Sequence, residues 1–407
     1  MNIGKLNIGP ATMVTAAFIG PGTVITASLA GANYGYALLW ALLFSVCASI
    51  ILQEMAARLG VVTQRGLGEN IRETFQRPLP RWCAMALVVS AIFIGNAAYQ
   101  GGNIAGAAVG VTALFRDWPG AAAAFNLPAI LITIIAFALL WSGSYRLIER
   151  ALVFLVALMS LAFLATFIVT RPDLGDLLRG LLVPGIPDGA ALTVIALIGT
   201  TVVPYNLFLH SASASQKWKH RDQLPEARRD LLVSIPLGGL ISIAIASTAA
   251  SAFFQRQIDI QGASGLAASL EPLFGSGAAA FLGIGLFAAG ISSALTAPLA
   301  AAYALRGVLG LAGGMRSPGF RLTWLAVLLS GGTIATLGVR PVEVIWFAQV
   351  ANGLLLPIVT AFLLWEMNTD RLGEHRNNRL QNLLGCLVLL ITVLLGGRSL
   401  LSAFGAL

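Results

Sequence analysis

The sequence predicts an all-α integral membrane protein, and three observations carry that prediction. Hydrophobic residues make up 57% of the 407 residues, charged residues only 10%, and the mean hydropathy is +0.84, whereas a soluble domain has about 25% charged residues. Apolar runs of about 20 residues, long enough to cross a bilayer as helices, recur along nearly the whole chain. Two of these runs contain a proline step, Gly20-Pro21-Gly22 and Val203-Pro204, at which the helix is expected to break.

We expect about 11 membrane spans from the apolar runs. They lie near residues 8–33, 36–58, 82–113, 128–143, 146–170, 190–214, 231–254, 275–309, 321–338, 342–366 and 380–405. The hydrophilic stretches between them are too short to fold alone, so residues 1–407 form a single transmembrane domain. The three cysteines fall in apolar runs without metal-ligand spacing and are expected to be buried thiols.

The basic residues set the orientation. With the N-terminus in the cytoplasm, most of the 25 lysines and arginines fall in cytoplasmic segments, and only Arg116, Arg171, Arg179, Arg256, Arg340 and Arg398 fall outside. This asymmetry is the positive-inside rule. The formal net charge of +8 therefore reports topology and not a nucleic-acid partner. We expect a multi-pass protein of the inner (cytoplasmic) membrane, with the lipid bilayer as its surroundings and no obligate protein partner.

The first interrupted run contains Gly20-Pro21-Gly22-Thr23, and the second contains Thr201-Val202-Val203-Pro204-Tyr205. Proline lacks the N–H that a helix interior needs, and an unpaired backbone group in hydrocarbon costs several kcal/mol. Such breaks persist where they line a binding cavity, and one break opening each half of the chain is typical of inverted-repeat transporters. The alternative is a pair of proline kinks in ordinary helices.

The residues around these breaks resemble the NRAMP metal-ion transporter family over nearly the whole chain. The matching segments are residues 8–11, 20–23, 31–36, 58–60, 199–211, 289–293, 348–350 and 356–357. The resemblance implies a LeuT-type fold: two inverted five-helix repeats, at about 8–170 and 190–366, and one extra C-terminal helix at about 380–405. It also implies a secondary transporter and not an enzyme, and no nucleophile–base pair suggests otherwise.

The chain departs from the family where the family binds metal. The family has Asp-Pro-Gly-Asn at the first break and Met-Pro-His at the second; here these are Gly20-Pro21-Gly22-Thr23 and Val203-Pro204-Tyr205. The family's third-helix acids, which serve proton movement, correspond to Gln100 and Asn103. A divalent cation at bilayer depth normally needs a carboxylate. We therefore expect no metal site of transition-metal type.

What remains is a neutral, donor-rich site. Half-helix N-termini carry unpaired N–H groups and partial positive charge, which favour an anion or the negative end of a polar molecule. The candidate substrate-binding residues are Gly20, Pro21, Gly22, Thr23, Gln100, Asn103, Thr200, Thr201, Val203 and Tyr205. Asn206 and Gln349 are expected to be satisfied between helices. His210 is either a ligand or proton carrier or, as we favour, a hydrogen-bonded packing residue.

The sequence thus favours a transporter of a small anion, with bicarbonate a candidate, or of a small neutral polar solute. A divalent-metal transporter with a rebuilt site is the alternative, and a membrane sensor without transport is a third hypothesis. No cofactor is expected. Sodium is a possible coupling ion, because the resemblance allows a sodium site at Ile19, Ser292, Ser293 and Thr296, made of carbonyl and hydroxyl oxygens. The alternative is that these hydroxyls bond to carbonyls of their own helix.

Overall fold

The computed structural model describes residues 9–74, 78–115, 126–143, 164–254, 275–337 and 341–403, together with positions 150, 154, 157–158 and 161. This described part consists of helices joined by loops and turns, without a strand. The α-helices are α1 (Pro10–Phe18), α2 (Pro21–Tyr34), α3 (Leu39–Thr63), α4 (Leu67–Thr74), α5 (Pro78–Leu114), α6 (Leu127–Trp141), α8 (Leu174–Leu182), α9 (Ala191–Thr201), α10 (Pro204–Lys217), α11 (Leu224–Phe253), α13 (Ala278–Leu309), α14 (Pro318–Thr336), α15 (Pro341–Glu366) and α16 (Arg379–Ala403). Short 3₁₀ helices are η2 (Arg221–Gln223), η4 (Gly275–Gly277) and η5 (Asp370–His375).

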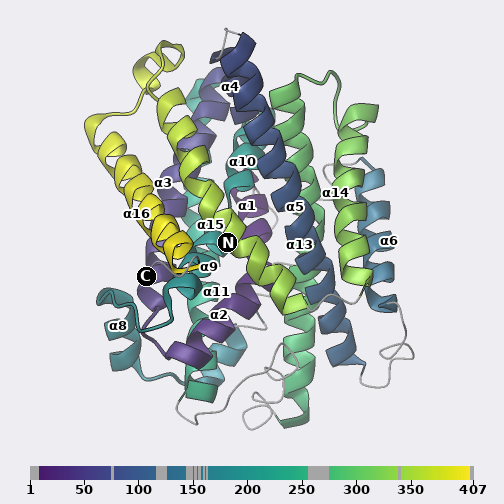
Figure 1. The fold of residues 1–407 in the computed structure, drawn as a ribbon, viewed down its shortest axis with the longest axis vertical. Helices are drawn as coiled ribbons and strands as arrows, with labels where there is room; N and C mark the ends of the chain where they lie inside the picture. The colour runs from purple at the N-terminus through teal and green to yellow at the C-terminus, as the bar shows by residue number, and fades with distance from the viewer. Residues whose placement is uncertain are drawn as a thin grey trace, which may run out of the picture.

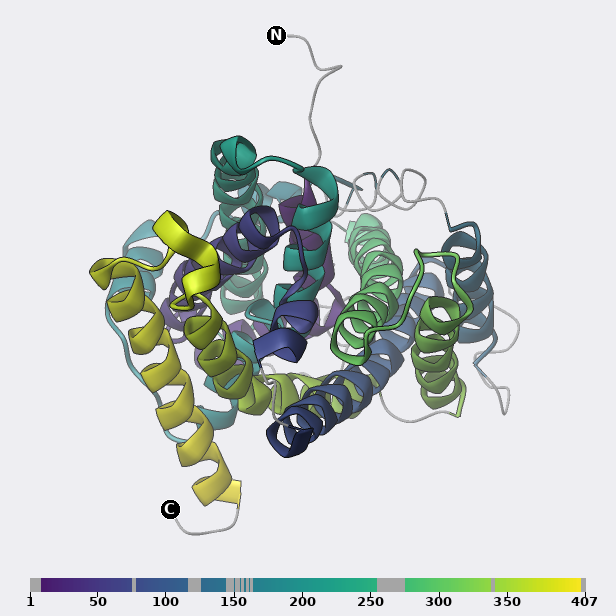
Figure 2. The same cartoon turned by 90° about the horizontal axis from the view of Figure 1, so that it is seen from above.

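The helices form one elongated bundle, with the four half-helices α1, α2, α9 and α10 at its centre (Figure 1). Long helices surround them: α5 packs along α13, and α11 packs along α2 and α3. Helices α6 and α14 lie together at one side of the bundle, and α16 lies at the opposite side against α15 (Figure 2). The centre of the bundle is therefore shielded on all sides by other helices.

The predicted spans correspond to helices wherever the structure describes them. Among the described residues, the segments long and apolar enough to cross a membrane are Leu39–Thr63, Ala191–Lys217, Arg221–Phe253, Ala278–Leu309 and Arg379–Gly397. Two further apolar helical segments are shorter, Leu127–Trp141 and Leu355–Glu366. The span expected at 146–170 falls largely outside the described residues. The repeat boundaries drawn from the sequence remain predictions.

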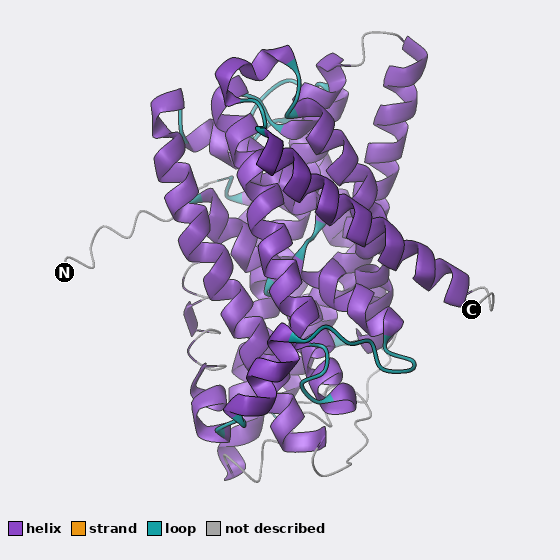
Figure 3. Ribbon diagram, turned by 90° about the vertical axis from the view of Figure 1, so that its left-hand side faces the viewer, coloured by secondary structure: helices purple, strands orange, loops and turns teal. Residues whose placement is uncertain are grey.

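Both expected breaks are present, and they are shorter than the sequence suggested. α1 ends at Phe18 and α2 begins at Pro21, so that only Ile19 and Gly20 are non-helical. α9 ends at Thr201 and α10 begins at Pro204. Each proline is the first residue of its half-helix, where its missing N–H costs nothing. The breaks appear as short loops among the helices inside the bundle (Figure 3).

The half-helices are held in place by each other and by their neighbours. α1 packs against α10 and α2 against α9, so the two breaks lie side by side. The start of α1 is fixed to α11, where the Ala11 N–H donates to Asp230 Oδ2 at 3.0 Å. The start of α2 rests on α5: a Cβ added to Gly106 would lie 2.2 Å from the Pro21 Cβ, so only glycine permits this approach.

Glu54 of α3 forms ion pairs with Arg58 at 3.0 Å and with Arg228 at 2.8 Å. The expectation that the cysteines are buried is wrong for Cys47 and Cys386, which are exposed on their helices. In a membrane helix an exposed face meets lipid, so an apolar residue has no reason to turn inward.

Candidate functional site

A hydrogen bond joins the two breaks. Thr23 Oγ1, in the first turn of α2, lies 2.8 Å from Thr200 Oγ1, in the last turn of α9. Both threonines are fully buried. Neither N-cap residue, Gly20 of α2 or Val203 of α10, caps its helix with a side-chain hydrogen bond. The site therefore combines two half-helix N-termini, which carry partial positive charge, with buried hydroxyl groups.

Gly20 lies against α13 and α5. A Cβ added to Gly20 would lie 2.4 Å from Ser293 Oγ and 3.4 Å from Asn103 Oδ1. The structure thus brings three of the sequence-predicted positions together at the first break. The absent side chain of Gly20 leaves room for these polar groups to approach the backbone.

Several buried amide atoms near the breaks have no hydrogen-bond partner within the described part of the chain. They are Asn103 Nδ2, Gln100 Oε1, and both Asn206 Oδ1 and Nδ2. The Gln100 amide nitrogen donates to the Ala294 carbonyl of α13 at 3.0 Å, so this side chain is anchored on α13. Because a buried polar atom without a partner costs about 1–3 kcal/mol, such atoms mark a place where a ligand or water binds.

Asn206 is the residue whose role the sequence misjudged. It was expected to be satisfied between helices, yet neither of its side-chain atoms has a partner in the described part, and the residue is fully buried. The side chain of Gln349, expected to behave likewise, lies outside the described residues. The position of Asn206 could have indicated a role in the site, because the residue lies in the first turn of α10, directly after the break.

The other residues of the second break differ in the groups that they present to a ligand. Val203 is buried, and its carbonyl accepts from the Asn206 N–H at 3.0 Å. Tyr205 is buried with its ring edge-on to Tyr99 of α5, at a centroid distance of 5.6 Å. Thr201 donates its hydroxyl to the Leu197 carbonyl of its own helix at 3.1 Å. Its proton is therefore not available to a ligand.

His210 is fully buried on α10, one turn after Asn206. Its Nδ1 lies 2.9 Å from Gln53 Oε1 of α3, so the ring is anchored between two helices. This contact fits the hydrogen-bonded packing role that the sequence favoured. Nε2 has no partner among the described residues.

The residues proposed for sodium also meet at the first break. Ile19 is the fully buried C-cap of α1, and Ser293 lies beside Gly20. Thr296 donates its hydroxyl to its own helix, with the Ser292 carbonyl at 3.1 Å and the Ser293 carbonyl at 3.2 Å. The hydroxyl oxygen of Thr296 keeps lone pairs that can still coordinate a cation.

The helices that build the site carry no acidic residue. The sequences of α1, α2, α5, α9, α10 and α13 contain neither aspartate nor glutamate. Within the described residues, no group of three or more His, Cys, Asp or Glu side chains is arranged to hold a metal ion. The site therefore presents neutral oxygens, amide donors and helix N-termini.

A family model described as "Natural resistance-associated macrophage protein-like" (Nramp) matches residues 11–402. The chain belongs to the Nramp family. A protein of Verminephrobacter eiseniae named divalent metal cation transporter MntH is 30% identical over 91% of this chain and 83% of its own length. A protein of the same name from Yersinia pestis is 28% identical over 98% of this chain and 95% of its own length.

Solved structures agree on the fold. The manganese transporter of Eremococcus coleocola superposes with a TM-score of 0.77 at 23% identity, covering 97% of this chain and 86% of that chain. MhsT in complex with L-phenylalanine superposes with a TM-score of 0.67 at 19% identity, covering 96% and 99%. The Nramp resemblance, the LeuT-type fold and the class of secondary membrane transporter, not enzyme, are thereby confirmed.

Proposed function

We propose that this Nramp protein carries a small anion or a small neutral polar solute through the two breaks, and that bicarbonate is its best candidate substrate. One observation carries the proposal: the six helices around the site hold no acidic residue, while each of the two neighbouring breaks contains a half-helix N-terminus without a side-chain cap. In a low-dielectric site, helix N-termini without a neighbouring carboxylate favour negative charge.

The amides supply the complementary donors. Asn103 Nδ2 and Asn206 Nδ2 are buried and lack partners in the described part of the chain, and either nitrogen can donate to an oxyanion. Bicarbonate is small, planar and singly charged, and it accepts several hydrogen bonds at once. A neutral polar solute would use the same donors and would gain less from the helix dipoles.

The alternative substrate is a divalent metal ion, which the names of the MntH relatives favour. A metal ion here would have to exchange its hydration shell for backbone carbonyls, hydroxyls and amide oxygens. Hard cations accept such ligands, but transition metals prefer thiolate, thioether or imidazole, and at bilayer depth a carboxylate normally offsets the charge. The residues at the breaks therefore support the anion better than the metal.

Sodium coupling belongs to the same proposal. Carrying an anion into a cell against a negative-inside potential costs about 2.3 kcal/mol per 100 mV, and an inward sodium ion offsets that cost. Ile19, Ser292, Ser293 and Thr296 offer only neutral oxygens, which sodium tolerates. Because the relatives are bacterial, we place this transport in the cytoplasmic membrane.

Uptake by purified protein in liposomes tests the proposal. The panel compares bicarbonate, small organic anions, manganese and magnesium, each with protein-free liposomes as the control. Saturable uptake of bicarbonate or of another anion supports the proposal. Saturable manganese or magnesium uptake without anion uptake would establish the metal alternative, and no saturable uptake at all would favour the sensor hypothesis.

A further inference from the structure

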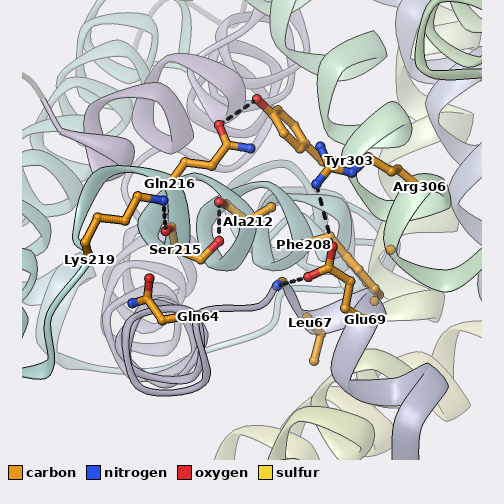
Figure 4. A pocket seen from close by; sticks show the side chains of 13 residues that line it. Gln64, Leu67, Glu69, Phe208, Ala212, Ser215, Gln216, Lys219, Tyr303 and Arg306 are labelled. Carbon is orange, nitrogen blue, oxygen red and sulfur yellow. Dashed lines mark hydrogen bonds and ion pairs between the residues drawn. The ribbon is translucent and has the colours of Figure 1, made fainter. Parts of the chain in front are cut away.

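A polar cavity lies apart from the breaks. It has a volume of about 190 Å³ and is enclosed by the start of α4, the later turns of α10 and the end of α13 (Figure 4). One water needs roughly 10–15 Å³ by such a measure. The cavity therefore has room for a small ion together with several waters.

Two helices that build the site at the breaks, α10 and α13, also line this cavity. On α10, Phe208 lines the cavity one turn beyond the break. On α13, Tyr303 lines it seven residues, or about 10 Å of helix, beyond Thr296. The basic residues of the sequence place this end of both helices on the cytoplasmic side.

Two cations and one carboxylate line the cavity: Lys219, Arg306 and Glu69. Lys219 Nζ donates one proton to the Ser215 carbonyl at 3.0 Å, and an ammonium group has two more. Arg306 Nη2 lies 3.8 Å from Glu69 Oε1, which is too long for a hydrogen bond. The cavity thus has a net positive charge and cationic donors that its own carboxylate does not saturate.

Close packing fixes this arrangement. A Cβ added to Gly307 would lie 2.9 Å from the Glu69 nitrogen, so the start of α4 rests directly on α13. The other carboxylate oxygen of Glu69 accepts from the Gly66 N–H at 3.0 Å. Across the cavity, the Tyr303 hydroxyl donates to Gln216 Oε1 at 3.3 Å. Glu69 is therefore held at the edge of the guanidinium group, where an incoming anion can replace it.

We propose that this cavity is a second anion site, in which the transported oxyanion binds Lys219 and Arg306 on its way to or from the cytoplasm while Glu69 yields its place beside Arg306. The inference rests on the proposed function. A guanidinium group binds an oxyanion through two parallel N–H bonds, and a lysine adds a point charge. Glu69 keeps the empty cavity from holding the anion too tightly.

Kinetics measured from each face of the membrane test this site. Right-side-out and inside-out vesicles are compared for the apparent KM of radiolabelled bicarbonate. Arg306→Gln and Lys219→Gln should each raise the KM about tenfold when the anion is applied at the cavity face, because a charge-assisted hydrogen bond is lost. The KM at the opposite face should stay the same.

Glu69→Gln should have the opposite effect on the KM. It should lower the KM at the cavity face severalfold, because it removes the competing carboxylate. Arg306→Lys keeps the charge but loses the two parallel N–H bonds, so it should recover only part of the affinity that Arg306→Gln loses. Arg229→Gln is the control, since Arg229 is an exposed cation of α11 that does not line the cavity. Its KM should match the wild type at both faces.

The outcomes separate this inference from the proposed function. An unchanged KM at the cavity face in the Arg306 and Lys219 variants, or an equal shift at both faces, would overturn the second site while leaving anion transport standing. Wild-type vesicles that take up no bicarbonate or other small anion from either face would overturn the proposed function, and the second site with it.

Discussion

Thr23 Oγ1 of α2 and Thr200 Oγ1 of α9 lie 2.8 Å apart, and this contact joins the broken helix of one half of the chain to that of the other. Both residues are fully buried. Because α2 and α9 come from opposite halves, any motion of one half against the other acts on this bond. The same two hydroxyls are among the groups that we expect to bind substrate.

The two threonines should behave as a coupled pair. Thr23→Val or Thr200→Val alone leaves one buried hydroxyl without this partner and should destabilise the protein by about 1–3 kcal/mol. The double variant removes both polar groups and should lose less than the sum of the single losses. Thermal unfolding of the purified variants in detergent measures this, and strictly additive losses would refute the coupling. Anion uptake should stay impaired in the double variant.

Two substitutions of Gly20 distinguish the effect of an added charge on anion uptake from the effect of an added side chain. Gly20→Asp should abolish anion uptake, because the carboxylate would neutralise the half-helix dipoles beside Ser293 and Asn103. Gly20→Ala is the matched control: its Cβ requires Ser293 Oγ to rotate away but adds no charge. We expect Gly20→Ala to reduce uptake only severalfold, with both variants folded as judged by gel filtration. Anion uptake by Gly20→Asp at the wild-type rate would show that the substrate binds elsewhere.

Sodium dependence tests the coupling. Replacing sodium with choline at fixed pH should lower anion uptake at least tenfold if the sodium site exists. Ser293→Ala, next to Gly20, should raise the sodium concentration needed for half-maximal uptake. Thr296→Ala should have a smaller effect, because the Thr296 hydroxyl already bonds its own helix. Equal rates in sodium and choline would rule out sodium coupling.

The breaks and the fold could be predicted from sequence because their signals are local. Proline and glycine in an apolar run report a helix break at the residues themselves, and both breaks lie within two residues of the expected places. The predicted breaks were longer than the observed ones, because a proline is favourable at the first position of a helix and the second half-helix therefore begins at the proline itself.

The partners of the polar residues could not be predicted in the same way. Gln53 lies beside His210, and Ala294 accepts from Gln100, although each pair is far apart in sequence. Which face of a membrane helix meets which neighbour depends on packing, and hydrophobic periodicity is weak when every face is apolar. For the same reason the sequence alone used Arg306 and Lys219 only to predict topology, and it did not predict that they line one cavity.

Direct binding to the purified protein tests the central claim, which is that the breaks bind an anion and lack the ligands for a transition metal. Calorimetric titration of the same preparation with manganese and with bicarbonate is the measurement. We predict saturable bicarbonate binding that Gly20→Asp abolishes, and no saturable manganese binding in the micromolar range. A micromolar manganese isotherm that is lost in Thr23→Val or Tyr205→Phe would contradict the account.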